Sequence, residues 1–250
     1  MNQQRLKNFL FGLVAATILI AVMIAGYNFI GQPTLQRVFQ IFGGQMPVGI
    51  VQYITYIAFF WGFFEMQQLL RQVKYEDGSL HLHLLPEQEQ WVLSPDDLNE
   101  LKIKMIDFEK QHKYLMVDII KKAATKFRAD KSVSDVLSVV SSQVKINYAR
   151  AESKQSIIRY IAWAIPSLGF IGTILGIAQA LGFAHQADTP EGLANITNSM
   201  YLAFDTTLVA LLLSIIMMWI FHELQEKEEL LHTNIEEYII ENLVNRIHLE

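Results

Sequence analysis

Three adjacent polar residues interrupt an apolar stretch in the last quarter of the chain. They are Asp205, Thr206 and Thr207, and Asp205 is the only charged residue between Gly192 and His222. A charge in the middle of a membrane helix costs roughly 2.5–3.5 kcal/mol on insertion scales, so it is usually kept for a protein contact, a water-filled cavity or an ion path. Carboxylates and hydroxyls can bind a cation or pass a proton, and these three residues are therefore candidates for lining an ion path.

Small residues recur at helical spacing in this stretch and in the apolar stretch before it. The first face consists of Pro166, Gly169, Thr173, Gly176 and Ala180, with Gly172 adding a GxxxG pattern, and the second consists of Ala203, Thr207, Ala210 and Ser214. Small faces allow close approach of membrane helices, so they predict that the chain packs against copies of itself. They also admit two interpretations, namely packing alone or a narrow passage with a threonine on each side.

The position of Asp205 leaves its role open. At 100° per residue it lies about 160° around the helix from Thr207, on a stripe with Asn198 and Tyr201. It is either a group near the ion route, kept ionised in a wet vestibule, or a partnered acid that orients helices.

No other catalytic chemistry is evident in the sequence. The chain has no cysteine, and we find no phosphate-binding loop, no metal-ligand cluster and no nucleophile with a neighbouring base. His81 and His83 share one face of an expected strand, but no third ligand follows at a suitable spacing, so a solvated face is the favoured interpretation. We therefore predict no catalytic residue, no metal site and no cofactor, and we rank a membrane enzyme last.

Composition indicates a membrane protein. The chain has 250 residues, of which 52% are hydrophobic and only 18% charged, against about 25% charged in soluble domains. Because a span needs about 20 apolar residues, the charge-free stretches predict four membrane helices near 9–30, 45–64, 160–184 and 199–221. The first apolar run is too long for the core of a signal peptide, so it is expected to remain as an anchor.

The basic residues predict the orientation. Of the 20 Lys and Arg residues, fifteen lie in 65–159, two precede the first span and two follow the last, and Arg37 alone lies in an expected outer loop. Positive charge is retained on the cytoplasmic side, so both termini and 65–159 are predicted to be cytoplasmic. The tail is acidic and dominates the net charge of −5, which disfavours nucleic acid as a partner.

The expected fold is all-α, with long helical cytoplasmic extensions and one small β-hairpin. Asp77-Gly78 and the alternating leucines after it predict the hairpin. Ser94 and Pro95 can start a helix, and an apolar heptad stripe runs from Leu98 to Ile119. The third span is expected to be continuous with a helix from about 133, in which Pro166 should cause a kink, and the fourth span should continue into the tail.

These elements suggest four parts. They are 1–64 with the first two spans, a mainly helical cytoplasmic domain over 65–159, the last two spans over 160–224, and an acidic helical tail over 225–250.

The segments "PSLGFIGTILGI" and "LAFDTTLVALLLSI" resemble the MotA/TolQ/ExbB proton channel family. The positions that match its motifs are Pro166, Gly169, Gly172, Thr173, Gly176 and Thr207. The resemblance covers about 65 residues, from Ile158 to Leu224. The layout is similar to the MotA branch, whereas the motif is nearer to TolQ and ExbB. Members of these two groups often carry a glutamate five residues before the second threonine. That position is Leu202 here, and Asp205 lies one turn further along.

The resemblance implies a function in a bacterial inner membrane. It implies a homopentamer around two single-span MotB/TolR/ExbD-like helices, whose membrane aspartate binds the ion beside the threonines. Flow of protons, with sodium as the other candidate ion, would drive rotation or conformational work on a cytoplasmic or envelope target. The alternative is a non-conducting oligomeric membrane scaffold, in which the small faces serve only for packing.

Overall fold

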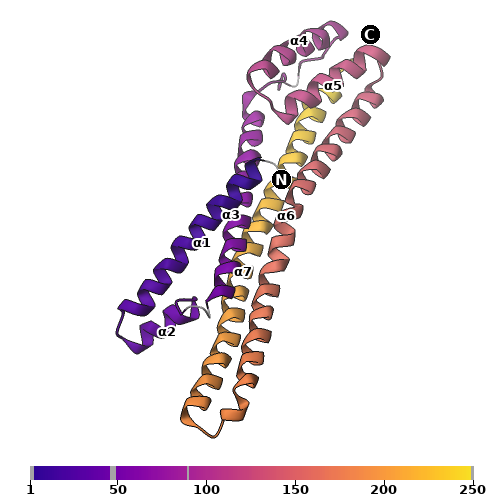
Figure 1. The fold of residues 1–250 in the computed structure, drawn as a ribbon. Coiled ribbons are helices and arrows are strands. Elements are labelled where there is room, and N and C mark those ends of the chain that lie inside the picture. Colours follow the sequence, from indigo (N-terminus) through magenta and orange to yellow (C-terminus); the bar gives the residue numbers. More distant parts are fainter. Residues whose placement is uncertain (1–2, 46–48, 89, 249–250) are drawn as a thin grey trace. The chain divides into compact units, whose positions relative to one another are not determined.

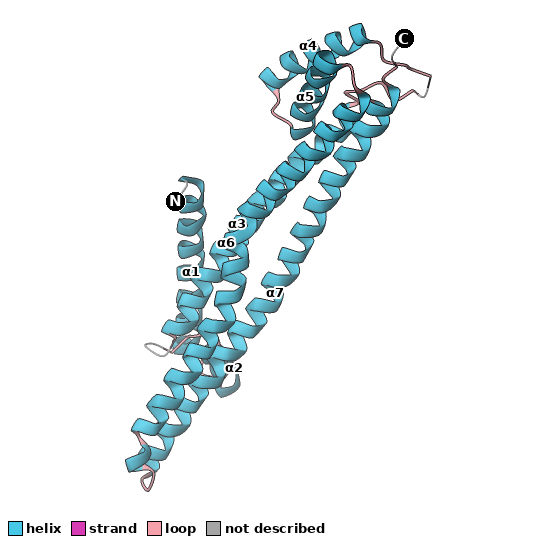
Figure 2. Ribbon diagram, turned by 90° about the vertical axis from the view of Figure 1, so that its right-hand side faces the viewer, coloured by secondary structure: helices cyan, strands magenta, loops and turns pink. Residues whose placement is uncertain are grey.

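The computed structural model describes residues 3–45, 49–88 and 90–248, and these residues are almost entirely helical (Figure 1). The α-helices are α1 (Gln3–Phe29), α2 (Pro33–Ile41), α3 (Ile50–Asp77), α4 (Pro95–Gln111), α5 (Leu115–Asp130), α6 (Val133–Gly182) and α7 (Pro190–Asn242). Short 3₁₀ helices occupy Gly78–Leu82, Ala184–Gln186 and Val244–Arg246. Figure 2 shows these helices and their connecting loops, with no strand in the described part of the chain.

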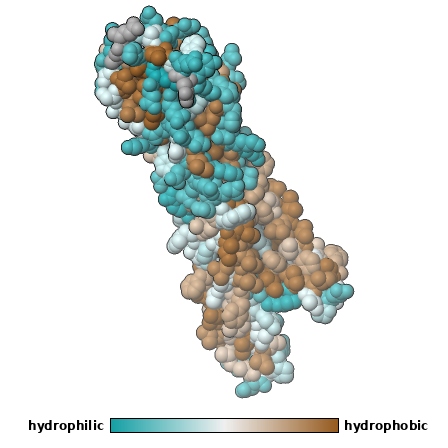
Figure 3. All heavy atoms as spheres, turned by 180° about the vertical axis from the view of Figure 1, so that it is seen from behind, coloured by the Kyte–Doolittle hydropathy of each residue, from teal (hydrophilic) through white to brown (hydrophobic). Residues whose placement is uncertain are grey.

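The chain divides into two compact units. Unit 1 consists of Met1–Gln68 and Ser156–His222, and unit 2 consists of Leu69–Gln155 and Glu223–Glu250. The helices α3, α6 and α7 each contribute residues to both units. The visible surface is mainly hydrophobic over unit 1 and mainly hydrophilic over unit 2 (Figure 3).

Three helices within the described residues are long and apolar enough to cross a membrane. They are α1, α6 and the helical stretch Pro190–Arg246 that contains α7. The fourth expected span, near 45–64, is not supported, and its residues 46–48 lie outside the described part of the chain. The charge-free length was misleading, because uncharged polar side chains such as Gln52 and Tyr53 lower the hydropathy of α3.

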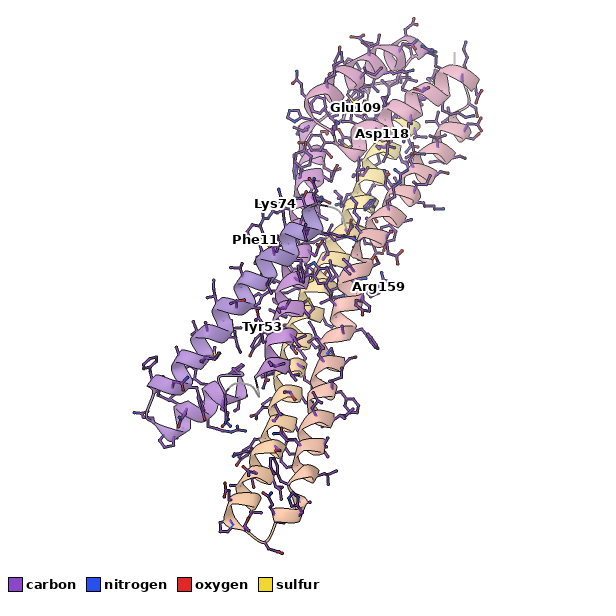
Figure 4. The ribbon with its side chains drawn as sticks, viewed as in Figure 1. Phe11, Tyr53, Lys74, Glu109, Asp118 and Arg159 are labelled. Atoms are coloured by element: carbon purple, nitrogen blue, oxygen red, sulfur yellow. The ribbon has the colours of Figure 1, made fainter. Side chains whose placement is uncertain are left out.

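These polar side chains of α3 find partners inside unit 1. Tyr56 donates a hydrogen bond to the carbonyl of Phe42 (3.0 Å), and the hydroxyls of Tyr53 and Thr17 lie 2.9 Å apart. Figure 4 labels Tyr53 on α3 and Phe11 on the neighbouring α1. Tyr56 is buried in a core cluster with Ala16, Ile20 and Val209, so α1, α3 and α7 share one core.

The helices α1 and α3 run antiparallel in close contact. A Cβ atom at Gly12 would lie 2.7 Å from the backbone nitrogen of Trp61, so only glycine fits there. The rings of Phe9 and Trp61 meet edge to face, and Asn8 donates a hydrogen bond of 2.6 Å to Gln68. Within unit 1, α3 therefore returns the chain to the level at which α1 begins.

The prediction of a β-hairpin, which falls in unit 2, is wrong. Residues 78–82 form a 3₁₀ helix that continues directly from α3, with the Ser79 hydroxyl bonded to the Glu76 carbonyl at 2.6 Å. A strand requires a partner, and the alternating leucines have none in the described residues. Unit 2 does contain one isolated β-bridge among its described residues, but it joins Leu93 to Ile247 near the C-terminus.

The helix expected after Ser94 is confirmed. Ser94 and Asp97 form a capping box, and Pro95 takes the first helical position of α4. The heptad stripe is not one helix, however, because α4 ends at Gln111 and packs against α5.

The turn between α4 and α5 is held by residues of α3. The Tyr114 ring stacks on the Tyr75 ring, with the two ring centroids 4.6 Å apart. The Leu115 N–H donates a hydrogen bond of 2.8 Å to the Glu76 carboxylate. Burial raises the pKa of Glu76, and this hydrogen bond acts in the opposite direction. Glu109 of α4 and Asp118 of α5, labelled in Figure 4, both form ion pairs with Lys121, at 2.6 and 3.3 Å.

The long helices are confirmed. The α6 helix begins at Val133, after the Ser132 hydroxyl that accepts a hydrogen bond of 3.3 Å from the Asp135 N–H. It is unbroken to Gly182, with Pro166 inside it. The α7 helix is likewise continuous from Pro190 to Asn242 and carries the apolar stretch into the tail.

Candidate functional site

In unit 1 the two small faces pack against each other. A Cβ atom at Gly169 would lie 2.5 Å from the Ala210 Cβ, and one at Gly176 would lie 2.7 Å from the Ala203 nitrogen. Ala203 and Ala210 are buried at this contact. The faces expected to join copies of the chain are thus occupied within one chain, where they bring antiparallel α6 and α7 together.

Close packing places the two threonines in direct contact. The Thr173 hydroxyl donates to the Ala203 carbonyl and the Thr207 hydroxyl to the Gly169 carbonyl, both at 3.1 Å, and the two hydroxyl oxygens also contact each other. Each hydroxyl has one proton and two lone pairs, so these contacts cannot all be hydrogen bonds at once. The pair can therefore exchange donor and acceptor roles without moving either helix.

Thr206 has a different environment from its neighbour. Its side chain is almost fully buried, and its hydroxyl contacts the carbonyls of Leu202 (3.0 Å) and Ala203 (3.1 Å) on its own helix. A Cβ atom at Gly172 would lie 2.5 Å from the Thr206 Cβ. Gly172, the extra glycine of the GxxxG pattern, is therefore needed to accommodate Thr206.

Asp205 is a partnered acid. Its two oxygens accept hydrogen bonds of 2.7 and 2.8 Å from the guanidinium of Arg37 on α2, and its side chain is only 8% exposed. The guanidinium also lies over the Tyr201 ring, 4.2 Å from its centroid. A bidentate pair of this kind fixes both position and orientation, so α2 is attached to α7 at this point.

The structure separates the predicted site residues into two groups. Thr173 and Thr207 meet at the contact of α6 with α7, whereas Asp205 is directed to α2. Arg37 was missed as a site residue. The signal for it was present, because Arg37 is the one basic residue in an expected outer loop and Asp205 the one acid between Gly192 and His222.

The remaining chemistry of the described residues is limited. They contain no group of three or more His, Asp or Glu side chains that could hold a metal ion. His83 adopts a left-handed conformation after the 3₁₀ helix, and its Nδ1 lies 2.7 Å from a Glu87 oxygen. This hydrogen bond holds the pKa of Glu87 below its usual value.

Long apolar helices that meet at a central pair of hydroxyls indicate a membrane protein. Residues 111–237 match the family model for the MotA/TolQ/ExbB proton channel family, which covers about half of the chain. The chain therefore belongs to this family. The matched region includes all of α5 and α6, most of α7, and both threonines. Neither a curated protein nor a solved structure shows significant similarity to the chain.

Proposed function

We propose that the chain is the channel-forming subunit of an ion-driven, stator-like membrane complex. In this complex a ring of copies encloses single-span partner helices and converts ion flow into rotation or conformational work. The observation that carries the proposal is the pairing of Thr173 with Thr207 between two apolar helices. Family membership supports it, because the matched region contains both residues.

The threonine pair suits the transfer of a cation. Hydroxyls both donate and accept, and the carbonyls of Gly169 and Ala203 supply further oxygens at the same point. A proton is the proposed ion, and sodium is the other candidate because it also binds hydroxyl and carbonyl oxygens. One charge crossing 100 mV releases about 2.3 kcal/mol, so repeated passages can drive a mechanical step.

Asp205 and Thr206 then have a supporting role beside the path. Both side chains are buried, one against Arg37 and the other against Gly172. We assign the path itself to Thr173 and Thr207, and we assign to Asp205 the positioning of the outer part of α7.

The proposed location is a bacterial inner membrane, with both termini cytoplasmic. The basic segment 65–159 and the basic N-terminus belong on the cytoplasmic side. The bond between Asn8 and Gln68 supports this, because it brings the start of α1 and the start of that segment to one level within unit 1. Residues 1–64 and 160–224 would form the membrane part, and 65–159 and 225–250 the cytoplasmic part. This topology needs four crossings, so it includes the proposal that α3 crosses the membrane packed against α1, although its hydropathy does not identify it as a span.

The proposed assembly is a homopentamer with a MotB/TolR/ExbD-like partner that carries a membrane aspartate. Since the small faces are used inside the chain, contacts between copies must use the outer faces of the helices. Exposed residues of α6 and α7 such as Phe170 and Phe204 are available for this.

A non-conducting scaffold is the second candidate. It is favoured by one observation, namely that the hydroxyls of Thr173 and Thr207 already have carbonyl acceptors inside the chain. In that case the pair would serve only to hold α6 and α7 together.

The variant Thr207→Val separates the two functions, with Thr207→Ser as its matched control. Valine keeps the shape but removes the hydroxyl, so the purified ring with its copurified partner should lose ion flux in proteoliposomes. Loss of one hydrogen bond at the limiting passage, about 1.4 kcal/mol, corresponds to roughly tenfold lower flux. Serine should retain most of the flux. Unchanged flux in Thr207→Val would refute the path and leave the scaffold.

A further inference from the structure

The exposed surface of α6 and α7 in unit 1 contains a long band without polar side chains. On α6 the exposed residues between Trp163 and Gln179 are Phe170, Ile171, Ile174, Leu175, Ile177 and Ala178. On α7 those between Tyr201 and Trp219 are Phe204, Leu208, Leu211, Leu212, Ile215, Ile216 and Met218. A continuous apolar band of this size on two adjacent helices belongs in the apolar layer of a membrane, where lipid tails and the apolar faces of neighbouring copies can both cover it.

One end of the band is marked by exposed aromatic residues. Tyr160 and Trp163 on α6 are 61% and 69% exposed, and Trp219 on α7 is 69% exposed. Because α6 and α7 are antiparallel and Thr173 meets Thr207, Trp219 lies level with the turn from Tyr160 to Trp163. Tyrosine and tryptophan side chains have both an apolar ring and a polar group, so they concentrate at the membrane–water interface.

The other end of the band is marked by the return of exposed polar residues. Gln179 on α6 and Tyr201 on α7 are exposed and lie at one level by the same register. The helix α2 lies near this level, because Arg37 contacts both Asp205 and Tyr201.

The surface of α2 is also typical of a helix at a membrane interface. Its exposed side includes Leu35 and Val38, and Phe29 at the end of α1 is 88% exposed. An amphipathic helix with an uncovered apolar side lies in the interface plane, with that side toward the acyl chains. In Figure 1, α2 ends well before the tip of the hairpin formed by α6 and α7, all within unit 1.

The band has the thickness of a bilayer on each helix. At 1.5 Å per residue, Tyr201 to Trp219 spans about 27 Å and Tyr160 to Gln179 about 28 Å. On α1, Lys7 to Asn28 spans about 31 Å. The hydrocarbon core of a bilayer is about 30 Å thick, and both α1 and the paired helices α6 and α7 match this value.

We propose that the bilayer covers unit 1 between two interfaces, one at Tyr160, Trp163 and Trp219, and the other at Gln179, Tyr201 and α2. Phospholipid headgroups contact both. The hairpin of 180–200 then projects beyond the membrane by about 16 Å, counted from Tyr201 to Pro190. This placement shortens the spans expected at 160–184 and 199–221, and it puts the ion pair of Asp205 close to the interface. It depends on membrane insertion and does not require ion conduction.

Single-cysteine variants test the outer boundary, since the chain has no cysteine of its own. Leu181 is 70% exposed and lies outside the proposed bilayer but inside the span expected from the sequence. In membranes opened on both sides, Leu181→Cys should react with a membrane-impermeant maleimide as fully as Ala187→Cys in the exposed turn. Ile174→Cys, exposed in the middle of the band, should not react. An unlabelled Leu181→Cys or a labelled Ile174→Cys would overturn the placement.

Tryptophan fluorescence tests the inner boundary. In proteoliposomes, variants that keep only Trp163 or only Trp219 should be quenched most strongly by lipids spin-labelled near the headgroup. A tryptophan introduced as Leu211→Trp in a background without other tryptophans should be quenched most strongly by labels deep in the acyl chains. Strongest quenching of Trp163 or Trp219 by deep labels, or no quenching by any lipid, would overturn the placement. Neither experiment measures ion flux, so either can fail or succeed independently of the proposed channel.

Discussion

Replacing Asp205 with asparagine should weaken the attachment of α2 to α7 by about 2 kcal/mol. Asparagine keeps one acceptor oxygen, but its NH₂ group would face a guanidinium N–H, so one of the two short bonds to Arg37 is lost. A hydrogen bond to a charged group contributes about 1.5–3 kcal/mol, and breaking a fully buried ion pair costs about 3–5 kcal/mol. The Arg37 side chain is 33% exposed, so water compensates in part and the lower range applies.

A double-mutant cycle measures this energy. Thermal unfolding of the detergent-purified protein should show a midpoint lower by about 4–8 °C for Asp205→Asn, at 2–4 °C per kcal/mol for a chain of this size. Arg37→Gln should lower it at least as much, because it also removes the contact with the Tyr201 ring. The double variant should be little worse than Arg37→Gln alone.

The matched control is Asp188→Asn, which removes an exposed acid from the turn between α6 and α7. It should leave the midpoint unchanged. If the effects of Asp205→Asn and Arg37→Gln instead add to within about 0.5 kcal/mol, the two residues do not stabilise each other and the attachment of α2 by this pair is refuted.

Two further substitutions test local packing and capping. Gly172→Ala should destabilise unit 1 by about 1–3 kcal/mol, because its Cβ would overlap Thr206, whereas Gly182→Ala has open space and should not lower the unfolding midpoint. Ser94→Ala should speed amide exchange in the first turn of α4 about fivefold, as expected for loss of a cap of about 1 kcal/mol. Hydrogen bonds from Ser94 lower the pKa of Asp97, so this stabilisation is present above pH about 4, the ordinary pKa of aspartate, and is lost as the pH falls further. The protection factor of these amides, which is the intrinsic exchange rate divided by the observed rate at the same pH, should therefore vary less with pH in Ser94→Ala in that acid range.

Local features of the fold were predictable from the sequence. The cap at Ser94, the start of α6 after Ser132 and the unbroken course of α6 depend on residues within one or two helical turns. Such features follow from periodicity and capping, which a sequence displays directly. The prediction that one helix carries the heptad stripe failed at His112. The turn there is fixed by Tyr75 and Glu76, which are distant in sequence.

Counting charges predicted a fourth span that is not supported, and the partner of Asp205 was not predicted at all. Counting charges made 45–64 resemble a span, although the uncharged polar residues of α3 lower its hydropathy. Arg37 and Asp205 are 168 residues apart, and no periodic pattern connects them. A rule that pairs an isolated acid in an apolar stretch with an isolated base in an outer loop would have suggested this contact.

The pairing of Asp205 has a consequence for where the ion-binding acid must come from. No acidic residue occurs between Tyr160 and Ala187, and Asp205 is the only one between Gly192 and His222. Since Arg37 neutralises Asp205, the membrane parts of α6 and α7 offer a passing cation only neutral oxygens, those of Thr173 and Thr207 and the carbonyls beside them. Neutral oxygens can hand on a proton but hold it weakly against water. If the chain conducts as proposed, the carboxylate that binds the ion at the level of the threonines therefore has to be supplied by another chain, which is the role that the family resemblance gives to the single-span partner.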